Sequence, residues 1–226
     1  MRKWEALPSD MQNEEVRKYY DILQKRKGSL VIKRIFDIMV SGVLVLVLIP
    51  VFIILGIMIK LDSPGPIMFR QVRVTTYGKK FRIFKFRTMV NNADKIGTQV
   101  TTKGDARVTR VGKLLRGCRL DELPQLFNIL CGDMTLVGTR PEVEKYVNQY
   151  TDEMKATLLL PAGVTSKASI CYKDEERLLE SADDADRVYV ETILPEKMKY
   201  NLQAIEEFSF WQDIKTMFET VVAVLK

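Results

Sequence analysis

Two acidic residues, Asp121 and Glu122, stand side by side in the segment RLDELPQLFN, which runs from Arg119 to Asn128. Pro124 follows them closely, and a helix tolerates proline in its first turn, so we expect Asp121 to be the N-cap of a helix. The positive end of the helix dipole would keep both carboxylates anionic. An anionic carboxylate can be a nucleophile or a metal ligand, although a plain cap with an acidic first turn has the same pattern.

Basic residues surround this pair. They recur at every third position before it, at Arg107, Arg110, Lys113, Arg116 and Arg119, and Arg140 follows in the segment GTRPE. On a helix of 3.6 residues per turn, each step of three residues falls about 60° short of a full turn, so only neighbours share a face. Arg116 and Arg119 lie nearest the pair. Arginine forks bind phosphate oxygens, and Mg²⁺ bridges carboxylate and phosphate, which favours phosphate chemistry. A solvated basic face, or a basic skirt over anionic lipid headgroups, explains the same arginines.

Composition excludes several other chemistries. The chain has 226 residues, a net charge of +6 and no histidine, so Ser-His-Asp and Cys-His nucleophile systems and His-ligated zinc are excluded. A basic balance favours anionic partners. Cys118, Cys131 and Cys171 show no CxxC spacing, and we expect them to be reduced core residues. The sequence contains neither a P-loop nor a dinucleotide-binding fingerprint.

The elements that must position the pair begin with an apolar segment. Ile38 to Ile59 contains no charged residue, and a straight helix of this length would span roughly 33 Å, enough for a bilayer. Pro50 divides the segment into two shorter parts, and a helix-interior proline kinks or breaks a helix. Basic residues flank both ends, so the residues alone allow either a kinked single span or a helix that returns to the same face.

The remaining pattern is α+β and mostly helical. Ser9 to Lys27 predicts a surface helix, with Ser9 and Gln12 as a capping box and Gly28 as its end. The segments IMFRQVRV and KKFRIFKFRTM flank TTYG and predict a short β-hairpin. The helix after the acidic pair carries an apolar stripe and ends at Gly132; the stripe is Leu123, Leu126, Phe127 and Leu130. The last segment, SFWQDIKTMFETVVAVL, is amphipathic and either packs on the core or lies at a lipid interface.

Four features follow one another in the sequence: an apolar run flanked by Lys and Arg and broken by proline, then KFRTM, LDELPQLFNIL and GDMTLVGTRP. With these features in this order, the sequence resembles the bacterial sugar transferase family, the monotopic phosphoglycosyl transferases. The resemblance covers about residues 31 to 160. It implies transfer of a sugar-1-phosphate from a UDP-sugar to a polyprenol (undecaprenyl) phosphate, with release of UMP. It also implies a covalent aspartyl-phosphosugar intermediate, a requirement for Mg²⁺, and a role in starting capsule, exopolysaccharide or lipopolysaccharide assembly.

The resemblance assigns roles to particular residues. Asp121 matches the nucleophile and Glu122 its partner, and both are expected to be ligands of Mg²⁺. The residues expected to bind substrate are Arg116, Arg140, Arg87 and Lys173. Two departures concern the membrane helix and the last motif. Ile49 stands before Pro50 where the family often has serine, and PAGVTSKASICYKDEERLL replaces the family's PGITG…QVNGR, so Lys173 only roughly matches an arginine.

The resemblance also implies a domain organisation. We expect a surface helix in residues 1–30, a re-entrant membrane helix broken at Pro50 in residues 31–62, and a small catalytic domain with C-terminal amphipathic helices in residues 63–226. The catalytic domain would lie on the cytoplasmic face of the bacterial inner membrane. The expected partners are the UDP-sugar, the polyprenol phosphate and the membrane, without nucleic acid; self-association, the sugar and the glycan stay open. The alternatives are a membrane-anchored basic module that binds nucleic acid or anionic lipid, and an inactive scaffold.

Overall fold

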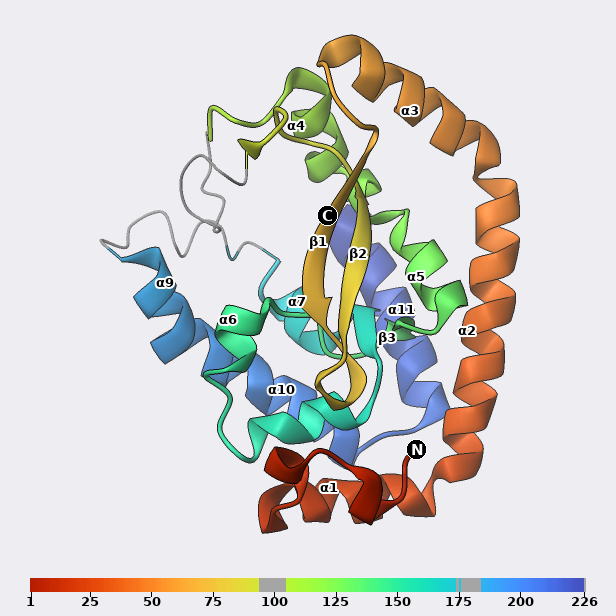
Figure 1. Ribbon diagram of the computed structural model, residues 1–226. Coiled ribbons are helices and arrows are strands. Elements are labelled where there is room, and N and C mark those ends of the chain that lie inside the picture. The colour runs from red at the N-terminus through yellow and green to blue at the C-terminus, as the bar shows by residue number, and fades with distance from the viewer. Residues whose placement is uncertain (94–104, 174, 176–183, 226) are drawn as a thin grey trace.

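A computed structural model describes residues 1–93, 105–173, 175 and 184–225. It is α+β and mostly helical, as the sequence predicts, and a β-hairpin lies in front of a cluster of helices (Figure 1). The first half contains α1 (Glu14–Lys25), α2 (Lys27–Val47), α3 (Ile49–Asp62), β1 (Met68–Val74), β2 (Lys80–Phe86) and α4 (Arg110–Gly117). The second half contains α5 (Gln125–Cys131), β3 (Met134–Val137), α6 (Glu144–Val147), β4 (Ala162–Thr165), α7 (Lys167–Cys171), α9 (Ala185–Val188), α10 (Leu194–Glu206) and α11 (Phe210–Leu225).

The predicted hairpin is confirmed. Strands β1 and β2 are antiparallel, with Met68 opposite Phe86 and Val74 opposite Lys80. The connecting turn places Tyr77 and Gly78 at φ values of 56° and 74°. Alternate side chains of β2, Phe81 and Ile83, are buried in the core. The hairpin therefore has one face on the domain, which sets the direction of its other side chains.

A second sheet, which the sequence did not predict, joins β3 and β4 in parallel, with Met134 opposite Ala162 and Val137 opposite Thr165. Beyond its end, the amide of Gly138 donates to the Thr165 carbonyl at 2.9 Å, and the amide of Gly163 donates to the Thr139 carbonyl at 2.8 Å. A Cβ on Gly163 would lie 2.2 Å from backbone atoms of Gly138, so the two chains can approach only without a side chain there. This close approach fixes the start of the segment that carries Arg140.

The N-terminal helix begins and ends elsewhere than predicted. Asn13 is the N-cap of α1, and its side chain accepts a hydrogen bond from the Val16 amide at 2.9 Å, whereas Ser9 starts a separate 3₁₀ turn, Ser9–Met11. Helix α1 does not extend to Gly28: it ends at Lys25, and after a break at Arg26 the chain continues as α2, which contains Gly28. Helix α1 buries Val16, Tyr19, Tyr20 and Leu23 against Leu202, Ile205 and Phe208. It is therefore packed along one face on the C-terminal part of the chain.

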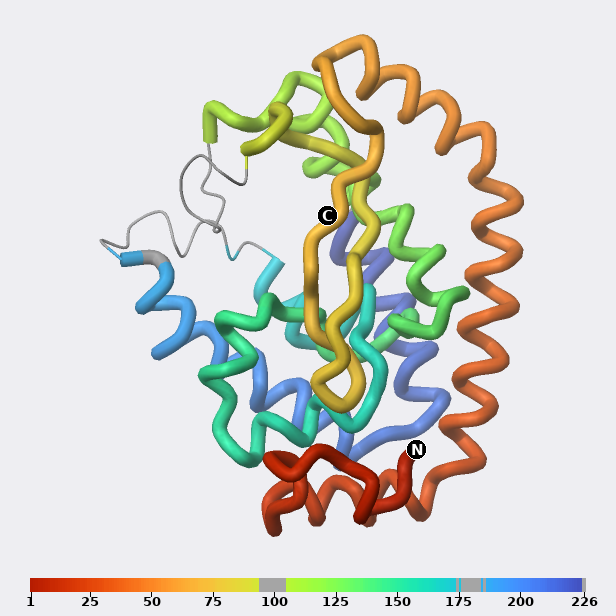
Figure 2. The backbone as a smooth tube through the Cα atoms, in the orientation of Figure 1, coloured from red at the N-terminus to blue at the C-terminus, as the bar shows by residue number. Residues whose placement is uncertain are grey.

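Helices α2 and α3 form a bent pair on the outside of the molecule (Figure 2). The two axes differ by 61°, and the break lies at Leu48, with Pro50 in the first turn of α3. The predicted interruption near Pro50 is thus confirmed, but the break lies two residues earlier. Proline fits the first turn of a helix better than a helix interior, so the new helix begins just before it. Among the described residues no single helix meets the length and composition of a membrane span, but α2 and α3 meet them together.

The three cysteines are exposed, so the prediction that they are core residues was wrong. Cys118 follows the last residue of α4, Cys131 ends α5 and Cys171 ends α7. Each therefore lies at the end of a short helix, where a side chain points past the packed face. The predicted stripe on α5 is also shifted, because Ile129 is fully buried whereas Leu130 is exposed.

Candidate active site

Asp121 and Glu122 lie in a 3₁₀ turn, Leu120–Glu122, and not at the start of a helix. Helix α5 begins only at Gln125, and Pro124 occupies its N-cap position without a side-chain cap. The prediction that Asp121 caps a helix was therefore wrong. Arg119, just before the turn, has a left-handed backbone with a φ of 56°, which redirects the chain after α4. The charge states of the two carboxylates must be explained by their neighbours rather than by a helix dipole.

A buried asparagine joins the acidic turn to the hairpin. Asn128 of α5 is 0% exposed, its Oδ1 accepts from the Phe84 amide at 2.8 Å, and its Nδ2 donates to the Arg82 carbonyl at 3.0 Å. Both bonds satisfy backbone groups of β2 that are not paired with β1 at this position. Because Lys85 follows directly on β2, this contact places its ammonium against the acidic turn.

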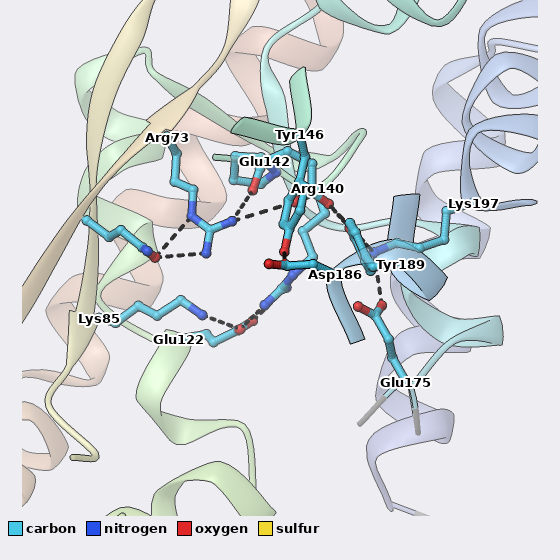
Figure 3. Close-up of polar contacts among 12 residues, drawn as sticks. Arg73, Lys85, Glu122, Arg140, Glu142, Tyr146, Glu175, Asp186, Tyr189 and Lys197 are labelled. Atoms are coloured by element: carbon cyan, nitrogen blue, oxygen red, sulfur yellow. Dashed lines mark hydrogen bonds and ion pairs between the residues drawn. The ribbon is translucent and has the colours of Figure 1, made fainter. Parts of the chain in front are cut away.

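Glu122 is held between two cations (Figure 3). Its Oε1 accepts from Lys85 Nζ at 2.9 Å, and Arg140 grips both oxygens, with Nη1 at 3.2 Å from Oε2 and Nη2 bonded to Oε1. Burial opposes ionisation of Glu122, but the charges and hydrogen bonds of Arg140 and Lys85 outweigh it and hold its pKa well below the usual range. Glu122 is therefore an anion that neutralises two partly buried cations.

Asp121 is buried, with 9% of its surface exposed, yet it is not paired. Within the described part of the chain, its carboxylate makes no hydrogen bond and no ion pair, in contrast to Glu122. Burial raises the pKa of Asp121, and the negative charge of the neighbouring Glu122 raises it further. The positive charges of Lys85, Arg116 and Arg140 stabilise the anion and offset part of that rise. The turn thus presents one engaged carboxylate and one available carboxylate within the field of three cations.

Arg140 is supported by a second buried group of charges (Figure 3). Arg73 Nη1 donates to the Pro141 carbonyl at 3.2 Å and lies 3.7 Å from Glu142 Oε2. The other oxygen of Glu142 accepts from the Tyr189 hydroxyl. Lys197 Nζ lies 3.6 Å from Glu142 and 2.9 Å from Glu175. We call this group the Glu142 network; it consists of Arg73, Glu142, Glu175, Tyr189 and Lys197.

The structure brings together only some of the residues that the resemblance assigned. Asp121, Glu122 and Arg140 form one cluster, and Arg116 is close enough to lower the pKa of Asp121. Arg87 lies elsewhere: it is 5% exposed, and its guanidinium donates to the carbonyls of Pro64 at 2.8 Å and Ser63 at 2.6 Å, at the end of α3.

Arg87 therefore clamps the turn after α3, and the close approach requires Gly65, since a Cβ there would meet Nη1 at 2.1 Å. Lys173 is exposed, and among the described residues its ammonium makes no hydrogen bond or ion pair; its carbonyl accepts from Arg119 Nη2 at 3.1 Å. Neither residue contacts the group formed by Asp121, Glu122, Lys85 and Arg140, which we call the Glu122 cluster.

Sequence reasoning missed Lys85 and the Glu142 network. Lys85 shares the alternation of Phe81 and Ile83, the two inward residues of β2, so a lysine at that position of a core-facing strand was the available signal. The network offered no such signal, because Lys197 and Tyr189 are distant in sequence from Glu142 and belong to a helical pattern.

The acidic turn can contribute to a metal site but cannot complete one. Among the described residues no group of three or more acidic or cysteine side chains is arranged to hold a metal ion. Asp121 has both oxygens available, and Oε2 of Glu122 keeps one lone pair beyond its bond to Arg140. Mg²⁺ often binds one or two carboxylates and takes its other ligands from substrate phosphates and water, and these residues fit that kind of site.

Comparison with known proteins identifies the family to which the chain belongs. The family described as Bacterial sugar transferase matches residues 28–226, and the chain belongs to this family. It is 37% identical over 197 residues, 86% of this chain, to the UDP-N-acetylgalactosamine-undecaprenyl-phosphate N-acetylgalactosaminephosphotransferase of Aeromonas hydrophila. It is also 37% identical over 195 residues, 84% of this chain, to a UDP-glucose:undecaprenyl-phosphate glucose-1-phosphate transferase of Escherichia coli (strain K12).

These relatives are longer proteins. The matched region covers 44% of the Aeromonas protein and 39% of the Escherichia coli protein. A UDP-glucose:undecaprenyl-phosphate glucose-1-phosphate transferase of Caulobacter vibrioides is 35% identical over 196 residues, which is 85% of this chain and 69% of that protein. These relatives are named for different sugars, N-acetylgalactosamine and glucose.

Proposed function

We propose that this protein is a polyprenyl-phosphate sugar-1-phosphate transferase that uses a UDP-sugar and releases UMP. The observation that carries the proposal is the available Asp121 carboxylate beside the clamped Glu122, in a chain of the sugar transferase family. The names of the relatives support a UDP-sugar donor and an undecaprenyl phosphate acceptor. The family membership supports a role in starting the assembly of a bacterial surface glycan.

The proposed reaction has two displacements at one phosphorus atom. An oxygen of Asp121 attacks the phosphorus next to the sugar, and the bond from that phosphorus to the bridging oxygen breaks, so UMP leaves with the electron pair. An oxygen of the polyprenol phosphate then attacks the same phosphorus and breaks its bond to Asp121. The carboxylate is regenerated, and the product is a polyprenyl diphosphate sugar. Two displacements are favoured over direct transfer because Asp121 is the carboxylate with no partner among the described residues.

The other residues act on charge and position. Arg140 and Arg116 are proposed to meet the diphosphate, whose negative charge would otherwise repel the attacking carboxylate. Glu122 and Lys85 hold Arg140 and keep the turn in place. Mg²⁺, when bound through Asp121 and Glu122, would neutralise phosphate charge. The absence of histidine leaves no usual general base, and none is needed for a phosphate acceptor that is already anionic near neutral pH.

We further propose that α2 and α3 form a re-entrant helix in the cytoplasmic leaflet. The 61° bend and the exposed apolar side chains of both helices support this placement. Single cysteines near Lys33 and near Asp62 should be labelled from the same, cytoplasmic side. Because Cys118, Cys131 and Cys171 are exposed, they must first be replaced by serine. Labelling from opposite sides would exclude the re-entrant arrangement without excluding the chemistry.

The activity is tested by incubating the full chain with a panel of UDP-sugars, Mg²⁺ and undecaprenyl phosphate and measuring UMP. A sugar-labelled donor without acceptor should label the protein, and the label should map to Asp121. UMP release that depends strictly on acceptor, with no adduct after rapid quench, would instead support direct transfer. Chelation by EDTA should stop UMP release, and Mg²⁺ should restore it. If no donor gave UMP, the result would favour the alternative of a membrane-anchored basic module without catalysis.

A further inference from the structure

Helix α4 begins beside the end of α3 (Figure 1). Thr109 is the N-cap of α4, and its side chain accepts a hydrogen bond from the Gly112 amide at 3.0 Å. The amide of Val111, also in the first turn, donates to Oδ2 of Asp62 at 3.0 Å, and Asp62 is the last residue of α3. The first four amides of a helix have no partner within that helix. In α4, one of them is therefore satisfied by the helix's own cap and another by a carboxylate that belongs to a different helix.

The end of α3 is held at the same junction. Arg87, which binds the carbonyls after α3, also donates to the Ile59 carbonyl at 3.2 Å. A cation at the C-terminal end of one helix and the Asp62 carboxylate at the N-terminal end of the next both oppose the local helix dipole charge. Further along α4, Leu115 is 0% exposed and packs with Leu55 and Ile59 of α3. Helix α4 is thus seated on α3 by a polar contact at its start and by an apolar contact in its second half.

This seating determines the position of Arg116. Arg116 follows the buried Leu115 in the last turn of α4, and its charge acts on Asp121. The acidic turn is held from the other side, because Lys85 and Arg140 bind its glutamate. The turn and α4 are separate helical segments, joined through Arg119 with its φ of 56°. The contacts of α4 with α3 therefore decide where Arg116 lies relative to a turn that is already fixed.

We infer that Asp62 is a positioning residue of the transfer reaction: it fixes the start of α4 through the Val111 amide and so holds Arg116 where the donor diphosphate meets Asp121. This inference rests on the proposed function, which places the diphosphate at Arg116. Val111 and Arg116 are five residues apart, about 7.5 Å along the helix axis, so Asp62 acts through α4 and not by contact with the substrate. Small displacements of a group that positions the reacting atoms cost up to about 10²-fold in rate.

The last turn of α3 offers a matched set of variants. Asp62→Ala removes the acceptor of the Val111 amide, whereas Asp62→Asn keeps an oxygen that can accept from it, and asparagine and aspartate are equally good acceptors at helix starts. Lys60 lies in the same turn, and its ammonium donates to the Gly65 carbonyl at 2.9 Å. Among the described residues Lys60 makes no hydrogen bond to α4, so Lys60→Ala disturbs the end of α3 without removing the contact under test.

Each full-length variant is assayed for UMP with Mg²⁺, undecaprenyl phosphate and the UDP-sugar that the wild type uses best. Asp62→Ala should lower kcat/KM for the donor by about 10-fold, and Asp62→Asn and Lys60→Ala should stay within about threefold of the wild type. Hydrogen exchange of the amides of α4, measured by mass spectrometry, should be faster in Asp62→Ala and unchanged in Lys60→Ala. If Asp62→Ala does not fold, Asp62→Ser provides a shorter, uncharged side chain for the same measurements.

A double-mutant cycle separates positioning of Arg116 from a general structural contribution. In an Arg116→Met background, Asp62→Ala should lower kcat/KM by less than about twofold more, because the residue through which Asp62 acts is already gone. The same loss in both backgrounds, or near-normal activity of Asp62→Ala in the chain with Arg116, would overturn the inference and leave the proposed function intact. A wild-type protein that releases no UMP from any donor would overturn the proposed function, and the inference with it.

Discussion

The Glu122 cluster and the Glu142 network are built from the same parts but differ in how fully their charges are paired. In each, a buried glutamate lies between two cations: Lys85 and Arg140 for Glu122, Arg73 and Lys197 for Glu142. In the network, Glu175 and Tyr189 supply further partners. Beside Glu122, in contrast, Asp121 is buried with no partner among the described residues.

Under the proposed function, this difference would separate a reactive region from a supporting region. A buried carboxylate that is fully paired is stabilised where it is and has little to gain from a new bond, whereas an unpaired one is destabilised by burial. The two regions meet at the Arg140-Pro141-Glu142 segment, so the network can fix the position of Arg140 without using any group that the substrate needs. The predictions below test this division of roles.

The largest effect is expected for Asp121→Asn. Asparagine keeps the size of the side chain but cannot form the acyl phosphate, so UMP release should fall by about 10³-fold or more. Folding raises the pKa of Asp121, so in the wild type stability is lost as pH rises through that raised pKa. Thermal melts at neutral pH should therefore show an equal or higher Tm for the variant. A lower Tm would mean that Asp121 has a partner in the folded protein.

The adjacent substitution, Glu122→Gln, should have the opposite effect on stability. It leaves Arg140 and Lys85 buried without their counter-charge, which costs about 3 kcal/mol. Activity should fall by about 10²-fold, because Arg140 loses its position. Urea unfolding measures the first quantity and UMP release the second. Equal stability of the Asp121→Asn and Glu122→Gln variants would contradict the distinction between a paired and an unpaired carboxylate.

Arg140→Lys should reduce kcat/KM by about 10- to 100-fold, because lysine keeps the charge but loses the planar fork that grips both oxygens of Glu122. Arg116→Lys serves as the companion variant near Asp121. Steady-state kinetics over donor concentration measures both. Near-normal activity of both variants would assign these arginines a lipid-facing or structural role.

Lys85→Met should change the pH dependence. Asp121 reacts as the anion, so activity is lost as pH falls through its pKa, and Lys85 is a cation that holds that pKa down. Without it, the acid limb of kcat/KM should move to higher pH, whereas Lys85→Arg should leave the limb close to its wild-type position. An acid limb that does not move in the methionine variant would mean that Asp121 does not control it.

The smallest effect on catalysis is expected in the Glu142 network. Tyr189→Phe removes one hydrogen bond to Glu142 and should lower stability by about 1 kcal/mol. The KM for the donor and kcat should each change by less than about threefold, since the remaining partners of Glu142 still hold the segment after Arg140. A loss of activity comparable to that of Arg140→Lys would place Tyr189 in the reactive region.

The sequence by itself determined the elements with strong local signals. The β-hairpin, the interruption near Pro50 and the αL residue Gly132 at the end of α5 follow from alternation, from proline and from glycine, and each depends on a few neighbouring residues. The family resemblance assigned Arg140 to the substrate, and the structure places its guanidinium on Glu122. The helix cap at Asp121 did not form, because Pro124 and the left-handed Arg119 delay the helix to Gln125.

Only the tertiary structure decided which of the charged residues are paired. Lys85, Arg140 and Glu122 come from three separate elements, and their pairing depends on the contact of Asn128 with β2. Arg87, two residues after Lys85, was expected at the substrate but instead binds the carbonyls after α3. The polar inner and apolar outer faces of α2 and α11 likewise appear only when burial is known, because a helical pattern gives the two faces of a helix but not which of them meets the protein.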